Sequence, residues 1–132
     1  MSRIDPGTNA VVDTIPVCNG PSGIATGAGA VWVVNSLDGT VSRIDPGTNT
    51  VVQRVHVGGG PRGIVYAAGS VWVANTGGGT ITRIAAKSGR PTKQLQVAAT
   101  ELAFGAGTVW ASQRAAGQVV RIDPTTGRQV FA

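Results

Sequence analysis

The amino-acid sequence predicts an all-β fold made of repeated units, each with four antiparallel strands. Three observations support this prediction. A tryptophan recurs at intervals of 40 and then 38 residues, at Trp32, Trp72 and Trp110. Each tryptophan lies among short segments rich in valine, isoleucine and threonine, which are separated by turns containing glycine or proline. No segment shows the 3.6-residue period of an amphipathic helix.

The unit that spans residues 20–59 shows the four expected strands in order. Residues 23–29 are small and apolar, and residues 30–36 (AVWVVNS) are rich in strand-forming residues. Residues 39–45 alternate between two faces, and residues 50–57 form a further β-branched run. Because glycine-containing turns separate these runs, we expect consecutive strands to pair as hairpins.

The turn between the third and fourth strands has a clear physical basis. In the segment IDPGTN, Pro46 sets φ for the first turn position and Gly47 tolerates positive φ. The Asp45 carboxylate can accept hydrogen bonds from backbone N–H groups beyond the proline. The copy at residues 85–91 (AAKSGRP) lacks the Asp-Pro pair, so we expect a looser turn there.

Composition and charge exclude several classes of protein. The 132 residues are 42% hydrophobic and only 13% charged, which argues against disorder. The net charge is +5, which could indicate nucleic-acid binding. Seven charges occupy recurring positions of the repeat: Arg3, Arg43, Arg83, Arg121, Asp5, Asp45 and Asp123. The other cations are scattered, so nucleic acid is not the expected partner.

Other sequence features are uninformative about the compartment. The chain has no apolar run of 18 residues and no basic-then-apolar leader, so we expect a soluble protein without an export signal in this chain. The single cysteine, Cys18, cannot form a disulfide within the chain and fits any compartment. The localisation stays unknown.

Repeating units of about 40 residues with four strands are typical of β-propeller blades. We therefore expect one propeller array over residues 1–132, with a partial blade at 2–19 and blades at 20–59, 60–97 and 98–132. The last blade ends in the short tail RQVFA (128–132). The repeated tryptophans are expected to fill the space between blades, as core residues rather than ligand platforms.

The segment GPxGIAxGAGAVWVVNSxDGTVSRIDPGTNTVVxxVxVGGGP resembles the bacterial YVTN-type β-propeller repeats. These repeats are related to NHL repeats and to streptogramin-lyase-like propellers. The resemblance covers residues 2–128 and implies a propeller fold. It implies no particular activity, because such propellers serve as binding, scaffolding and sometimes enzymatic modules.

The lyase branch of the resemblance would imply histidines and a glutamate gathered around a divalent metal at the channel mouth. This chain has one histidine, His56, and one glutamate, Glu101. His56 falls on the fourth, outer strand of its unit, where a solvated surface residue is expected. A metal site needs more ligands than these two residues supply. We therefore expect no catalytic residues, no metal and no cofactor.

The segment SRIDPGTN occurs twice, at residues 2–9 and 42–49. The chain thus starts within a unit, with a complete fourth strand near the N-terminus and a curtailed one near the C-terminus. Three blades cannot close a ring, whereas two copies give six, within the usual range of roughly four to eight. We expect a homodimeric six-bladed ring in which the N-terminal strand of each copy completes the last blade of the other. The alternative is that the chain is a fragment of a longer propeller.

Any binding site is expected on the loops at the channel mouth, which join the fourth strand to the next unit and the second strand to the third. The candidate ligand-binding residues there are Ser22, Arg62, Glu101, Asp38, Arg114 and Gln113. We assign Ser22, Arg62 and Glu101 to one repeat position, and an ordinary variable surface loop is the alternative reading of it.

The predicted function is a non-enzymatic binding or scaffold module for itself and for a small polar ligand or a protein. The alternatives are a lyase- or hydrolase-like propeller enzyme and a purely structural, possibly engineered, half-propeller.

Overall fold

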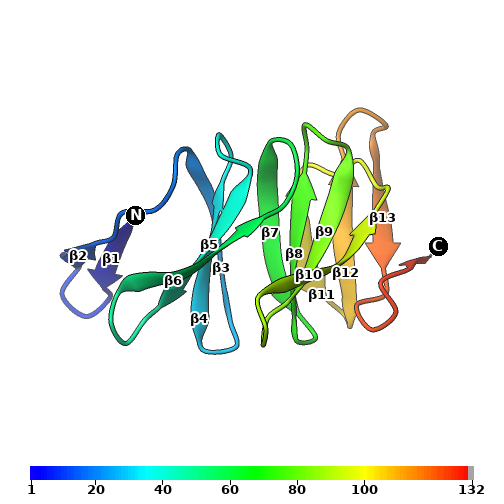
Figure 1. The fold of residues 1–132 in the computed structure, drawn as a ribbon. Coiled ribbons are helices and arrows are strands. Elements are labelled where there is room, and N and C mark those ends of the chain that lie inside the picture. Colours follow the sequence, from blue (N-terminus) through cyan, green and yellow to red (C-terminus); the bar gives the residue numbers. More distant parts are fainter. Residues whose placement is uncertain (131–132) are drawn as a thin grey trace.

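A computed structural model describes residues 1–130, and Phe131 and Ala132 of the expected C-terminal tail lie outside the described residues. The described chain consists of strands joined by short turns (Figure 1). In chain order the strands are β1 (Ser2–Asp5), β2 (Ala10–Thr14), β3 (Pro21–Gly27), β4 (Ala30–Asn35), β5 (Thr40–Asp45), β6 (Thr50–His56), β7 (Pro61–Ala67), β8 (Ser70–Asn75), β9 (Thr80–Ala85), β10 (Arg90–Leu95), β11 (Leu102–Gly105), β12 (Thr108–Gln113), β13 (Gln118–Ile122) and β14 (Gln129–Val130).

The strands form three four-stranded antiparallel sheets and one two-stranded sheet. We call β1–β2 the N-terminal hairpin, β3–β6 sheet 1, β7–β10 sheet 2 and β11–β14 sheet 3. Consecutive strands pair in every sheet, as the sequence predicts. The sheets follow one another across Figure 1, with the N-terminal hairpin and sheet 3 at opposite ends. The first strands are neighbours, since β7 contacts both β3 and β11.

Two of the apolar clusters fill the spaces between neighbouring sheets. The cluster between sheets 1 and 2 includes Trp32, Val41, Val55, Val71, Val73 and Ile84. The cluster between sheets 2 and 3 includes Trp72, Ile81, Leu95, Val109, Ala111 and Ile122. Trp32 and Trp72 are both 0% exposed, which confirms that these tryptophans are core residues. Burial of one large apolar side chain contributes about 1.5–3 kcal/mol, so these interfaces hold the sheets together.

Each tryptophan is held by the same two partners. The indole Nε1 donates to the carbonyl oxygen five residues earlier, at 3.0–3.4 Å. An arginine of the third strand lies over the indole, about 5 Å from the ring centroid, within the range for a cation–π contact. The arginine–tryptophan pairs are Arg43–Trp32, Arg83–Trp72 and Arg121–Trp110. The recurring arginines are therefore part of the blade, as predicted.

Two buried asparagines tie the second strand to the third. The Nδ2 of Asn35 donates to the hydroxyls of Thr40 and Ser42, and the Nδ2 of Asn75 donates to those of Thr80 and Thr82. Both asparagines are 0% exposed. Sheet 3 has glutamines instead, and the Nε2 of Gln118 donates to the Oε1 of Gln113 at 2.6 Å. In all three sheets, a side-chain amide therefore links the end of the second strand to the third strand.

The turns follow the sequence closely, with one exception. In IDPGTN, the Asp45 Oδ1 accepts from the Gly47 N–H and the Asp45 carbonyl accepts from the Asn49 N–H. The expectation of a looser turn after β9 is wrong, because the Gly89 N–H donates to the Ala85 carbonyl in the same way, at 2.7 Å. Gly89 takes the positive φ that Asn49 takes in sheet 1. A left-handed residue at this position therefore matters more to the turn than the Asp-Pro pair.

A hydroxyl after the second strand joins each sheet to the next one. The Ser36 Oγ of sheet 1 donates to the carbonyl oxygen of Pro61, which begins sheet 2, at 2.7 Å. The Thr76 Oγ1 of sheet 2 donates to the carbonyl oxygen of Ala99, just before sheet 3, at 3.1 Å. Arg114 occupies this position in sheet 3. The repeat thus places a hydrogen-bond donor at one edge of every interface between sheets.

Replacing Thr76 by valine keeps the side-chain shape and removes this hydrogen bond. We expect Thr76→Val to lower the free energy of unfolding by about 0.5–1.5 kcal/mol in urea titrations. Thr26→Val, on an exposed position of β3, is the matched control and should cost less than that. Equal stability of the two variants would contradict a stabilising role for the hydroxyl.

The turn between β7 and β8 offers a way to stabilise the chain. Ala68 has φ of +50° and Gly69 has φ of +77°, so both central residues are left-handed, as in a type I′ turn. Alanine is strained in this conformation, whereas asparagine tolerates it. We expect Ala68→Asn to raise the free energy of unfolding by about 0.5–1 kcal/mol. The β-branched Ala68→Val should lower it, and a more stable valine variant would refute the explanation by strain.

Candidate functional site

Loops from two kinds of connection meet at one edge of the molecule, the upper edge in Figure 1. Here the Ser36 N–H donates to the Gly20 carbonyl at 2.8 Å, and the Gly78 N–H donates to the Gly59 carbonyl at 2.9 Å. These bonds join the loop that enters a sheet to the loop between its second and third strands. We call this edge the loop face, formed by the connections 15–20, 36–39, 57–60, 76–79, 96–101 and 114–117.

Asp38 is the candidate site residue with the most contacts within the loop face. Its Oδ2 accepts from the Asn19 N–H at 2.9 Å, and its Oδ1 accepts from the Asn19 Nδ2 at 3.3 Å. The side chain is exposed, yet both carboxylate oxygens are engaged by the neighbouring loop. Asp38 therefore links the loop between β4 and β5 to the loop that enters sheet 1.

The assignment of Ser22, Arg62 and Glu101 to one repeat position is wrong. Ser22 and Arg62 each precede a glycine and fall at a register shift of the first strand, whereas Glu101 directly precedes Leu102. The Glu101 carbonyl accepts from the Ser112 N–H at 3.0 Å, so Glu101 stands where sheet 2 has Gly63. Thr100 stands where Ser22 and Arg62 stand, because Ala99 accepts from Thr76 as Pro61 accepts from Ser36. The two-residue deletion therefore falls before Ala99, a place that the spacing alone did not locate.

The replacement of glycine by Glu101 changes the inner edge of sheet 3. A Cβ added at Gly63 would lie 2.9 Å from the Glu101 Cα, and one added at Gly23 would lie 2.7 Å from the Arg62 carbonyl oxygen. Glycine at these positions therefore allows the first strand of the next sheet to approach closely. Sheet 3 instead carries an exposed carboxylate there.

Two hollows on the loop face share the residues Thr100 and Arg114. One has a volume of about 430 Å³ and is lined by Thr76, Ala98, Ala99, Thr100, Arg114 and Ala115. The other has a volume of about 500 Å³ and is lined by Thr100, Ser112, Gln113, Arg114, Gly117, Gln118 and Val119. Of the predicted site residues, Gln113 and Arg114 thus lie together. Thr76 and Thr100 were not among the predicted site residues. The hydroxyl residue that recurs at Ser36 and Thr76 of the repeat offered a sequence signal for Thr76.

The residues with metal-binding or nucleophilic side chains are dispersed. His56 is exposed at the end of β6, opposite Thr40, whereas Glu101 lies beside β11. The Cys18 Sγ accepts from the Arg54 Nε at 3.0 Å. Over residues 1–130, no three histidine, cysteine, aspartate or glutamate side chains gather into a group that could hold a metal ion.

The described residues contain no helix that is long and apolar enough to span a membrane.

No protein-family model matches the sequence, and no curated protein matches it. Solved structures do match. A hydrazine synthase from Kuenenia stuttgartiensis superposes on 97% of this chain and 41% of its own, with a TM-score of 0.88 and 21% identity. Streptogramin B lyase superposes on 85% of this chain and 40% of its own, with a TM-score of 0.71 and 18% identity. The computationally designed Ika4 protein covers 90% of this chain and 77% of its own, with a TM-score of 0.70 and 20% identity.

These identities show a shared fold and no shared activity. The chain spans less than half the length of the hydrazine synthase and lyase chains. The repeated four-stranded antiparallel sheets and the streptogramin lyase neighbour agree with the fold predicted from the repeat. The chain therefore has the β-propeller fold, of which it contains three four-stranded blades and a two-stranded hairpin.

Proposed function

We propose that the chain is a non-enzymatic binding or scaffold module that pairs with a second copy into a closed six-bladed ring. The observation that carries this proposal is a mismatch in burial between equivalent positions. Residues that are buried where one sheet packs on the next are exposed at the two ends of the array. Exposed apolar surface of this kind is typical of an interaction site.

The outer face of sheet 3 supplies the first half of this observation. Val41 on β5 and Ile81 on β9 are both 0% exposed, because the following sheet covers them. Val119 holds the same position on β13 and is 61% exposed. Trp110 is only half-buried, unlike the tryptophans of sheets 1 and 2. Sheet 3 thus presents the same surface that sheets 1 and 2 bury.

The face of sheet 1 beside the N-terminal hairpin supplies the second half. Ile24 on β3 is 58% exposed, whereas its equivalent Ile64 packs into the cluster between sheets 1 and 2. Val31 is half-buried, whereas its equivalent Val71 is 0% exposed. These two faces match the two sides of the internal interfaces. A second copy can therefore place its sheet 3 against this face, which gives six blades, within the range of roughly four to eight that propellers use.

We assign the binding role to the loop-face end of the interface between sheet 3 of one copy and sheet 1 of the other, which we call the seam. Sheet 3 contributes Glu101, Gln113 and Arg114 there, and the partner's sheet 1 would contribute Ser22. Glycine at this position allows close approach at the two internal interfaces. Because Glu101 replaces it in sheet 3, we expect the interface between copies to be wider at its inner end. A small polar ligand with an ammonium and a carboxylate group would match Glu101 and Arg114. The lyase-like alternative gains no support, because His56 and Glu101 lie on different sheets.

The assembly is tested by light scattering after size exclusion. At micromolar concentration we expect a mass of twice the 13.3 kDa of one chain. Val119→Arg should give the monomer, because a buried unpaired guanidinium is strongly unfavourable. Val52→Arg, at a 57% exposed register-shift position of the outer strand β6, is the matched control and should stay dimeric. A wild-type monomer would overturn the proposed ring and would favour covering of the end faces by further blades of a longer chain.

The binding role is tested by titrating the ¹⁵N-labelled protein with glycine, a small zwitterion. We expect shifts of the Thr100, Gln113 and Arg114 amides at millimolar glycine. Arg114→Ala and Glu101→Gln should each abolish the shifts, since each removes one complementary charge. Arg90→Ala, at the exposed start of β10, should leave them unchanged. Shifts that survive in both site variants would contradict binding at the seam.

A further inference from the structure

Two strands of each chain are candidates for a single place in the closed ring. β1 and β13 are both third strands of a unit and share the sequence Arg-Ile-Asp-Pro, at residues 3–6 and 121–124. Given the proposed ring, on which this inference rests, each closing blade has room for only one of them. In the ring, β2 can pair either with β1 of its own copy or with β13 of the second copy.

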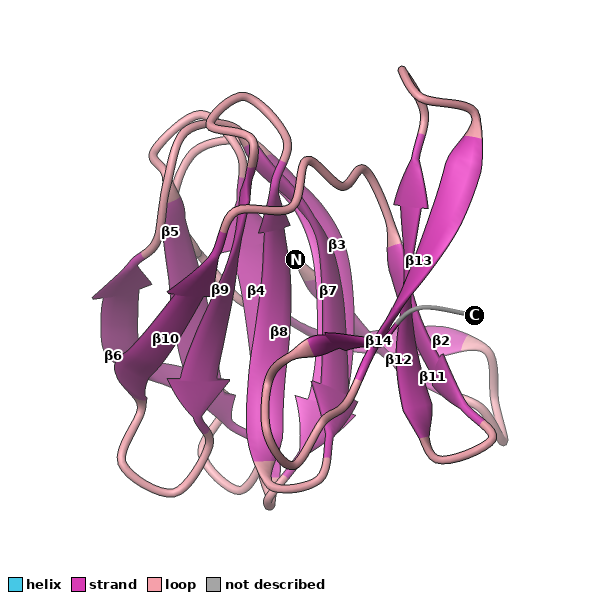
Figure 2. Ribbon diagram, turned by 90° about the vertical axis from the view of Figure 1, so that its right-hand side faces the viewer, coloured by secondary structure: helices cyan, strands magenta, loops and turns pink. Residues whose placement is uncertain are grey.

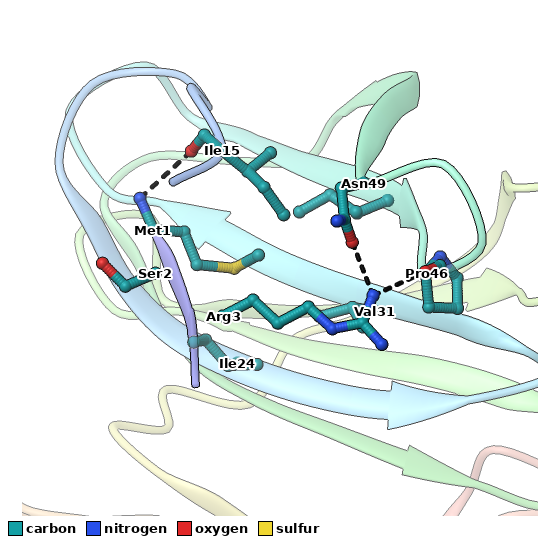
Figure 3. Close-up of a pocket in the computed structure, with 9 residues that line it drawn as sticks. Met1, Ser2, Arg3, Ile15, Ile24, Val31, Pro46 and Asn49 are labelled. Atoms are coloured by element: carbon teal, nitrogen blue, oxygen red, sulfur yellow. Dashed lines mark hydrogen bonds between the residues drawn. The ribbon is translucent and has the colours of Figure 1, made fainter. Parts of the chain in front are cut away.

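β1 already makes the contacts expected of a third strand toward sheet 1. Figure 3 shows the Arg3 guanidinium donating to the Pro46 carbonyl and to the Asn49 Oδ1, both at 2.6 Å. Within the chain, Arg83 of β9 reaches the following sheet in the same way, and its Nη1 donates to the Thr125 carbonyl at 3.4 Å. In both cases an arginine on a third strand binds the turn of the next sheet. Arg3 takes this role beside sheet 1.

β13 lacks the partners that a third strand has in the other sheets. β5 pairs with β6 along its whole length, from Thr40 to Asp45, whereas β14 pairs only with Arg121 and Ile122 of β13. The outer backbone edge of residues 118–120 is left without a strand among the described residues (Figure 2). The Nε of Arg121 is buried and has no hydrogen-bond partner. β13 thus offers both an open edge and an unpartnered arginine.

The N-terminal hairpin supplies the complementary strand. β2 pairs with β1 through Thr14 and Asp13, which lie opposite Ser2 and Arg3. Ile15, just beyond β2, is only 3% exposed and packs on Val33 and Ile44 of sheet 1. This anchor fixes β2 in its place even when its neighbouring strand is exchanged.

The two candidate strands differ in how firmly they are held. β13 pairs with β12 at five positions, and its Val120 and Ile122 are 8% and 0% exposed. β1 pairs with β2 alone, and Ser2, Arg3 and Ile4 are all exposed. Removal of β1 exposes the half-buried Met1 and its packing on Ile15, whereas removal of β13 would open the larger core between sheets 2 and 3.

We propose that β1 is a placeholder, which the β13 strand of the second copy replaces when the ring closes. The incoming strand gives up its two-residue pairing with β14 and pairs with β2 instead. Val120 then lies opposite Thr14 and Arg121 opposite Asp13, in the register that β1 now uses. Arg121 takes over the Pro46 and Asn49 acceptors from Arg3. Trp110 enters the apolar cavity of about 270 Å³ that Ile24, Val31 and Ile44 help to line (Figure 3).

The fit of the second copy rests on contacts that the chain already repeats. The cavity beside sheet 1 is bordered by the equivalents of Ile64, Val71 and Ile84, which pack in the cluster that contains Trp32. Arg114 of the second copy would reach the Pro21 carbonyl, the equivalent of the oxygens that Ser36 and Thr76 bind. The seam between copies is therefore a third example of an interface present twice within the chain.

Two double-cysteine variants in a Cys18→Ser background test the exchange. Opposite residues of an antiparallel pair are close enough for a disulfide. We expect oxidised Thr14→Cys/Val120→Cys to run as a covalent dimer on non-reducing gels. Oxidised Ser2→Cys/Thr14→Cys locks β1 onto β2, so it should be monomeric by light scattering and return to a dimer on reduction. The reduced forms control for folding.

The outcomes separate the exchange from the ring itself. A locked Ser2→Cys/Thr14→Cys protein that stays dimeric would show that β1 belongs to the ring, and would overturn the exchange while leaving the dimer intact. Monomers in every reduced variant and in the wild type would overturn both proposals. As a second measurement, Arg3→Gln should lower the dimer dissociation constant several-fold and Arg121→Gln should raise it. The opposite pair of signs would mean that β13 is the strand displaced.

Discussion

The packing of one sheet's face on the next governs the burial of every core residue in this chain. Each four-stranded sheet has apolar residues on both faces, so no sheet can bury its core alone. Trp32 and Trp72 fill the interfaces, and the arginine stacked on each indole completes the packing with its apolar stem. The ends of the array present the same faces without a following sheet, which accounts for the exposed Val119 and Ile24.

This constraint divides the polar residues into two groups. The recurring arginines and the asparagines Asn35 and Asn75 are held by partners within the fold, and their chemistry is used for stability. The loop face carries the residues that vary between units. Because its backbone is tied by bonds between loops, the side chains there change without disturbing the sheets. The proposed binding role therefore uses the loop face, and the proposed assembly uses the two ends of the array.

The repeat predicted the strands and most turns because these depend on local backbone chemistry. It failed where two different residue types can give a turn the same backbone geometry. Gly89 adopts the left-handed conformation that Asn49 adopts elsewhere, so the turn after β9 forms without an Asp-Pro pair. It also failed at the two-residue deletion before Leu102, where only the pairing of Glu101 with Ser112 shows that Glu101 aligns with Gly63. Of the predicted site residues, Gln113 and Arg114 share a hollow, whereas Asp38 is engaged by Asn19.

The amino-acid pattern was enough to predict the all-β class, the four-strand unit and the core role of Trp32 and Trp72, because period, β-branching and turn residues act over a few neighbouring positions. The packing of the sheets was needed to show which residues lie between sheets and which are left uncovered. Val41, Ile81 and Val119 occupy the same place in the repeat, yet the first two are buried and the third is exposed. Burial depends on the sheet that lies opposite, and a residue's own sequence neighbourhood does not contain that information.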